Sequence, residues 1–93
     1  MHEGALRQAY LETMLEDPGL GLEGFLRRAV GGEFGPVGRE ELLEFLHQVQ
    51  QDTIAGIYTR ASAHAEAAEE IERLVEERRE RIAALAARYA PQP

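Results

Sequence analysis

The chain has 93 residues and no cysteine, and its 17 acidic residues outnumber 10 basic ones, for a formal net charge of −7 at pH 7. This length allows one domain, residues 1–93, which buries a smaller share of its surface than a larger protein does. Without cysteine, neither a disulfide framework nor a thiolate metal site can stabilise it. The acidic balance disfavours direct binding of nucleic acid or of an anionic membrane, because both attract basic surfaces.

No apolar run is long enough to cross a bilayer, and the N-terminus lacks the basic-then-apolar order of a signal peptide. We therefore expect a cytoplasmic protein. All ten basic residues are arginine, and lysine, tryptophan and asparagine are absent. Abundant Glu and Arg make the composition thermophile-like, although Lys with Glu is the usual hyperthermophile signal and a GC-rich genome is the alternative explanation.

Two short helices are predicted near the N-terminus. The first fits residues 3–16, where apolar side chains recur at spacings of three and four. It ends at Asp17, because Pro18 disfavours helical backbone for the residue that precedes it. The second fits residues 22–30, which carry one apolar face, and a pair of glycines closes it.

A glycine-rich loop, residues 31–38, follows the second helix. It holds four glycines and a proline in eight residues, which excludes a regular element. We expect its two apolar side chains, Phe34 and Val37, to fasten it to the core. The loop lacks the lysine and hydroxyl of a phosphate-binding loop and no strand precedes it, so it does not predict nucleotide binding.

Residues 39–89 follow one long helical pattern. They contain no proline and a single glycine, Gly56, and an apolar stripe recurs every 3.5 residues, as in the seam of a coiled coil or bundle. A continuous helix of this length would be about 75 Å long. Either a second chain covers its stripe, or it folds back near residues 56–64. The tail, residues 91–93, is expected to be disordered.

These elements predict an all-α fold, in which two short helices pack on a long C-terminal helix or on a helical hairpin. We expect a dimeric helical bundle or coiled coil, because a chain this short needs help to cover the stripe. A homodimer or a higher homo-oligomer would supply that help. The predicted interface residues are the apolar members of the stripe: Ile54, Ile57, Ala61, Ala68, Ile71, Val75, Ile82 and Leu85.

Two histidines, His47 and His64, lie on the same stripe. They would make association depend on pH if they titrate in the seam, since an unperturbed histidine ionises near pH 6.5. The alternative is that they only fix the register of the seam. Glu44 and His47 also have the E-x-x-H spacing of ferritin-like di-iron ligands. A complete metal site would then be shared between chains, as in encapsulated ferritin-like proteins; otherwise Glu44 faces water.

No arrangement of a nucleophile and a base is visible in the chain. Cysteine is absent, and Ser62, the only serine, lies in a helical pattern among alanines. We therefore expect no enzymatic activity, no catalytic residues and no cofactor.

Residues 22–51, LEGFLRRAVGGEFGPVGREELLEFLHQVQQ, resemble the C-terminal helical domain of PadR-like transcriptional regulators, in which a short apolar helix, a turn and a proline precede a long helix. The stretch from Asp17 through Pro18 and residues 25–29 is similar to helical effector domains of TetR-like regulators. The chain departs from both families because it has no helix-turn-helix and no basic recognition helix. The resemblance implies a dimerisation or ligand-sensing domain of transcription regulation, detached from its DNA-binding domain.

The sequence thus predicts a non-catalytic helical module for oligomerisation or protein interaction, with a regulatory role. One alternative is the small-molecule-sensing effector domain of a transcriptional regulator, and another is the ferritin-like metal-binding protein. The residues predicted to line a ligand pocket in the sensor are Tyr10, Met14, Phe25, Phe45 and Tyr58.

Overall fold

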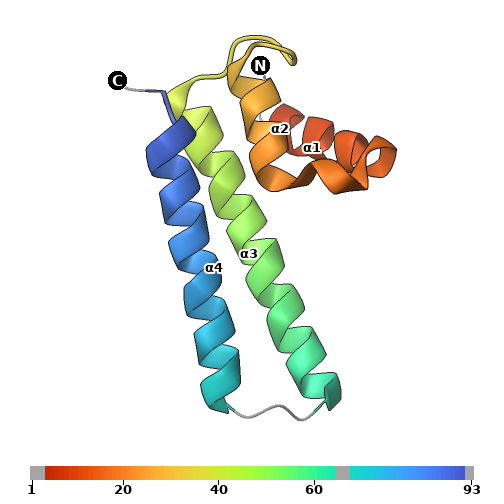
Figure 1. Cartoon of the computed structure of the whole chain (residues 1–93), viewed down its shortest axis with the longest axis vertical. Coiled ribbons are helices and arrows are strands. Elements are labelled where there is room, and N and C mark those ends of the chain that lie inside the picture. Colours follow the sequence, from red (N-terminus) through yellow and green to blue (C-terminus); the bar gives the residue numbers. More distant parts are fainter. Residues whose placement is uncertain (1–3, 65–67, 92–93) are drawn as a thin grey trace.

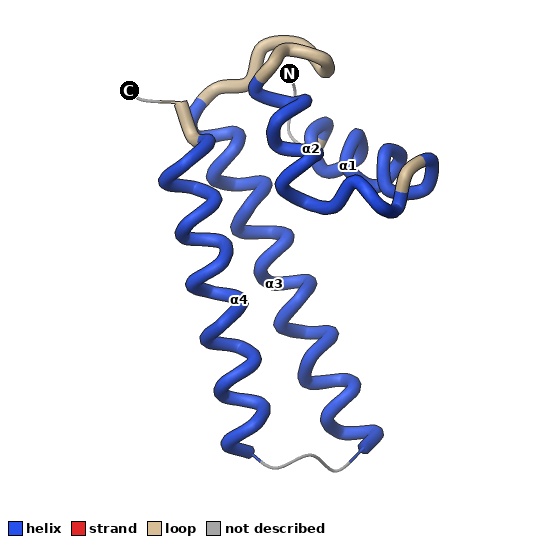
Figure 2. Tube along the Cα trace, in the orientation of Figure 1, coloured by secondary structure: helices blue, strands red, loops and turns tan. Residues whose placement is uncertain are grey.

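The computed structural model describes residues 4–64 and 68–91, and this part of the chain contains helices and no strand (Figures 1 and 2). The all-α prediction is therefore confirmed. None of these helices is long and apolar enough to cross a membrane. The elements in chain order are α1 (Ala5–Glu16), a 3-10 turn (Pro18–Leu20), α2 (Gly21–Val30), α3 (Arg39–His64) and α4 (Ala68–Tyr89).

Helix α1 ends where the sequence predicts. Glu16 is its last residue, and the backbone N–H of Asp17 donates to the carbonyl of Thr13 at 2.8 Å. Pro18 then occupies the first position of the 3-10 turn, where its missing N–H costs nothing. The predicted start at residue 3 lies outside the described residues.

The loop 31–38 is irregular and packs on the core, as expected. Its Gly32 and Gly35 have φ angles of 92° and 93°, a left-handed conformation that residues with a Cβ rarely adopt. Phe34 stacks on Phe25 of α2 with ring centroids 5.1 Å apart, and Val37 also packs against the core. These two side chains fasten the loop.

The prediction of one continuous helix over residues 39–89 is wrong, and the hairpin alternative is the arrangement found. Helix α3 ends at His64, α4 begins at Ala68, and the two run side by side in opposite directions (Figure 1). The physical reason is that the two halves of the apolar stripe cover each other within one chain, whereas a single continuous helix would leave the stripe in water. Gly56 lies inside α3 and does not break it.

The main hydrophobic core lies at the end of the hairpin next to α1 and α2. Phe25 and Leu26 of α2 and Leu42 and Leu46 of α3 are its largest fully buried side chains. Each contributes about 1.5–3 kcal/mol relative to an exposed position. Helix α4 adds Leu85 to this core. The core therefore holds α1, α2 and the loop against the near half of the hairpin.

Candidate functional site

The far half of the hairpin extends beyond α1 and α2 as a two-helix projection (Figure 1). We call this part the arm; it comprises residues 54–64 of α3 and residues 68–79 of α4. The ion pair between Arg7 Nη2 of α1 and Asp52 Oδ2 of α3, at 2.9 Å, lies just before the arm begins. The arm is thus a pair of helices that pack mainly on each other.

The arm has a narrow apolar seam that is separate from the main core. Ile57 and Ala61 of α3 and Val75 of α4 are buried in it, and none of the three belongs to the core cluster. Among the described elements, each helix of the arm has one neighbour there, and one neighbour covers only part of the apolar stripe of an amphipathic helix. Apolar side chains that are only half-buried on the arm are Ile54, Ile71 and Leu74.

The side chains predicted to form a seam between two chains divide by exposure into three groups. The buried group contains Ile57, Ala61, Val75 and Leu85. The half-buried group contains Ile54, Ile71 and Ile82, and Ala68 is exposed. The predicted stripe is therefore largely the internal seam of the hairpin. Association of two chains through the half-buried members stays a prediction.

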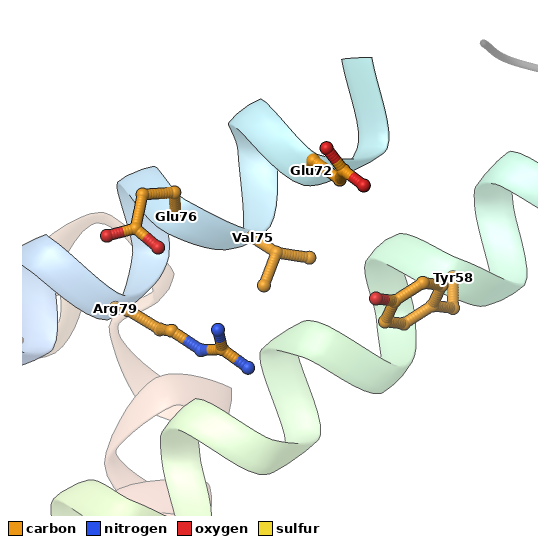
Figure 3. A pocket seen from close by; sticks show the side chains of 5 residues that line it. All are labelled: Tyr58, Glu72, Val75, Glu76 and Arg79. Atoms are coloured by element: carbon orange, nitrogen blue, oxygen red, sulfur yellow. The ribbon is translucent and has the colours of Figure 1, made fainter. Parts of the chain in front are cut away.

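A shallow groove of about 400 Å³ runs along one side of the arm between α3 and α4 (Figure 3). Val75 points into the space between the helices, and Tyr58, which is 53% exposed, borders the groove from α3. Three charged side chains of α4, Glu72, Glu76 and Arg79, line its other side. The groove therefore combines an apolar base, an aromatic wall and charges of both signs.

The charged side chains of the groove have no ion-pair partner within the described residues, although other charges of α4 do. Arg73 pairs with Glu70 and Glu77 on the same helix, and Arg81 reaches Glu23 of α2 at 3.5 Å. By contrast, no ion pair of the described part includes the carboxylates and guanidinium of the groove. These charges are therefore available to a partner.

The groove lies on the side of the hairpin that faces away from α1 and α2. Asp52, which pairs with α1, and Tyr58 are six residues apart, so their side chains point about 120° apart around α3. Arg81, which pairs with α2, and Arg79 are two residues apart and point about 160° apart around α4. A partner can approach the groove without meeting the first two helices.

A second charged cluster joins α2 to α4 around the carboxylate of Glu23. Arg88 Nη1 and the hydroxyl of Tyr89 both donate to Glu23 Oε2 at 2.7 Å. Arg81 lies 3.5 Å and Arg27 3.6 Å from the same carboxylate, and Arg27 Nε donates to the Tyr89 oxygen at 3.1 Å. The cluster fastens the near end of α4 to α2.

The hydrogen bonds from Tyr89 and Arg88 hold the pKa of the Glu23 carboxyl below its usual range. Sequence reasoning missed this cluster, because Arg88 and Tyr89 are 65 and 66 residues from Glu23 along the chain. Arg81 contacts Glu23 of α2, while Glu77, four residues before Arg81 on α4, pairs with Arg73. Helical spacing reveals only local pairs, and this cluster depends on tertiary packing.

The described residues of one chain place no further ligand beside Glu44 and His47, so a metal site shared between two chains stays a prediction. Both side chains are exposed on α3, and the Nε2 atoms of His47 and Gln51 lie 3.5 Å apart. Within residues 4–64 and 68–91, no group of three carboxylate or histidine side chains is placed to bind a metal ion. The His64 side chain lies outside the described residues, so the pH-sensitive histidine pair stays a prediction.

Four of the five residues predicted to line a ligand pocket are together, and one is not. The rings of Tyr10, Phe25 and Phe45 contact one another, with centroids 5.1–5.4 Å apart, and Met14 packs against the same core. Burial raises the pKa of the Tyr10 hydroxyl. Tyr58 instead lies on the arm, at the groove. The pocket prediction is therefore wrong in its placement of Tyr58.

Comparison of the chain with protein-family models, with curated proteins and with solved structures finds no match. The exposed features of the arm, and the groove in particular, therefore carry the functional proposal.

Proposed function

We propose that the chain is a non-catalytic association module that forms a homodimer through its arm. The observation that carries this proposal is the exposed side of the arm, where Tyr58 is 53% exposed and Ile54, one turn before it, is half-buried. In the described part, each helix of the arm packs on one other helix, which leaves this side uncovered. Two arms placed side by side would form a four-helix bundle, in which each helix has two neighbours. The second copy would cover the apolar surface that one hairpin leaves open.

Tyr58 is the expected anchor of this interface. Aromatic side chains contribute strongly to association, because they bury a large area while losing few rotamers. Another exposed apolar pair, Leu11 and Leu15, lies one turn apart on α1, and Leu15 is 84% exposed. The residues that line the groove all belong to α3 and α4 and none to α1, so we place the interface at the arm.

A sensor function is supported less well than association. The rings of Phe25 and Phe45, which the sensor alternative assigns to a ligand, are 0% and 2% exposed and contact each other directly. They therefore act as core residues. A dimerisation domain is also what the resemblance of residues 22–51 to PadR-like regulators implies, so a role in transcription regulation and a cytoplasmic location belong to the same proposal.

The test is the solution mass of the protein measured by sedimentation equilibrium over a range of concentrations. The wild type is expected to be a dimer, and Tyr58→Glu should weaken it by about thirtyfold or more, which is the effect of losing a 2 kcal/mol anchor. Thr59→Glu is the matched control, since Thr59 is the exposed neighbour of Tyr58 and its hydroxyl donates to the Ala55 carbonyl of the same helix.

Leu15→Glu tests the competing surface on α1. A wild type that stays monomeric at millimolar concentration would refute the proposed function. A dimer that Leu15→Glu dissociates, while Tyr58→Glu leaves it intact, would place the interface on α1 and also contradict the proposal. Circular dichroism of each variant checks that the helices remain folded.

A further inference from the structure

We infer that the groove is a self-complementary contact, in which Arg79 of each copy binds to Glu72 and Glu76 of the other copy. This inference rests on the proposed homodimer and adds to it the orientation of the two chains. It also assigns the chemical basis of partner choice, namely a second copy that presents the same three charges.

The order of the charges along α4 makes the groove complementary to itself. Glu72, Glu76 and Arg79 are spaced by four and three residues, so they share one face of the helix. A two-fold axis perpendicular to α4 brings the same patch of both copies together with the two α4 helices antiparallel. The carboxylate end of one patch then faces the guanidinium end of the other, and two sets of opposite charges meet.

The three side chains are free to make these contacts. Within the described residues they take part in no ion pair, whereas Arg73 and Arg88 of the same helix are engaged by glutamates. Arginine has a planar group with five donors, which suits binding to two carboxylates at once. Two unpaired carboxylates followed by an unpaired guanidinium on one face are the arrangement that a second copy would satisfy.

The apolar parts of the groove would strengthen the contact. Tyr58 borders the groove with an exposed ring, and Val75 lies between the helices (Figure 3). A guanidinium from a second copy would stack on such a ring, and partial removal from water would strengthen its attraction to the carboxylates above that of an exposed surface pair. The contact therefore combines the proposed anchor with charges that determine orientation.

The experiment reverses the charges of the groove in two separate variants. Arg79→Glu leaves three carboxylates on each patch, and the double variant Glu72→Arg with Glu76→Arg leaves three guanidiniums. Each variant alone should be monomeric where the wild type is dimeric, because like charges would meet across the axis. All three residues are exposed, and Arg and Glu have similar helix propensities, so folding should be kept.

Mixing the two variants in equal amounts should restore a dimer that contains one copy of each. Native mass spectrometry with one variant labelled with ¹⁵N identifies this heterodimer. Arg79→Gln is the milder companion, which removes the guanidinium without adding repulsion, and it should weaken the wild-type dimer by about tenfold. Circular dichroism confirms that each variant is helical.

The outcomes separate this inference from the proposed function. A monomeric wild type refutes both. A dimeric wild type whose reversed variants also stay dimeric overturns the groove contact and leaves the homodimer standing. Monomeric variants that do not combine on mixing also overturn it, because the groove would then not meet its own copy. Heterodimer formed only from the mixture supports the two-fold contact.

Discussion

Replacing Phe25 with alanine is the sharpest test of the core that supports the arm. Phe25 is fully buried, and its ring contacts Tyr10 at 5.1 Å, Phe34 at 5.1 Å and Phe45 at 5.4 Å between centroids. These contacts come from α1, the loop and α3, so one side chain joins α2 to three other segments. Truncation of Phe25 to alanine would leave a cavity, and α1, the loop and α3 would have to move together to fill it.

A buried Phe→Ala change costs about 3–5 kcal/mol, and the loss should be near the upper end here because three aromatic contacts disappear together. A domain of this size has a free energy of unfolding of roughly 5–14 kcal/mol in total. The melting temperature should therefore fall by roughly 15–40 °C. The matched control is Phe34→Ala, which removes a half-buried ring that stacks on Phe25 and should cost about 1–2 kcal/mol.

Urea denaturation followed by circular dichroism at a fixed protein concentration measures both losses. The concentration must be fixed, because self-association changes the apparent stability. A Phe25→Ala loss below about 1 kcal/mol, or one no larger than that of Phe34→Ala, would show that the segments do not depend on this ring. The reasoning about the core would then be refuted.

Two further predictions concern the ion cluster and the loop. The pKa of Glu23 is lowered from 4.5, so the carboxylate contributes its full stability above about pH 4.5 and loses it as the pH falls through the lowered value. The difference in free energy of unfolding between wild type and Glu23→Gln should therefore shrink between about pH 6 and pH 3, and a constant or growing difference would contradict this. Gly35→Ala should destabilise the protein by about 1–2 kcal/mol because of the positive φ, whereas Gly38→Ala, without a positive φ, should cost less; equal thermal shifts would contradict the role of Gly35.

The boundaries of the first helices could be predicted because their signals are local. Pro18 restricts the residue before it whatever the tertiary structure, and the glycines of residues 31–38 exclude a helix by themselves. Local signals of this kind do not distinguish a hairpin over residues 39–89 from one continuous helix. Two antiparallel helices need the same spacing of apolar residues whether the partner helix belongs to the same chain or to another.

The candidate site was predicted only in part, for a geometric reason. The predicted pocket groups Tyr58 with Phe45, and both residues belong to α3. The two residues are thirteen positions apart, and steps of 100° place their side chains about 140° apart around α3. Phe45 therefore enters the core while Tyr58 borders the groove. In the Glu23 cluster, Arg27 is a local partner four residues away, whereas packing of α4 on α2 brings Arg81 and Arg88 to the carboxylate, which no local pattern predicts.

The distribution of buried side chains links the arm to its proposed role. The four largest fully buried side chains all belong to α2 and the near half of α3, whereas the buried side chains among the described ones of the arm are Ile57, Ala61 and Val75. Isolated helices of this length are marginal in water, so the arm depends on a seam much thinner than the core. Parts of a protein with few buried contacts unfold locally more often than its core does. A second copy would cover Tyr58 and the groove, and it would bind only the folded arm. Such binding shifts the folding equilibrium of the arm toward the folded state, so dimerisation would stabilise the most weakly packed part of the chain.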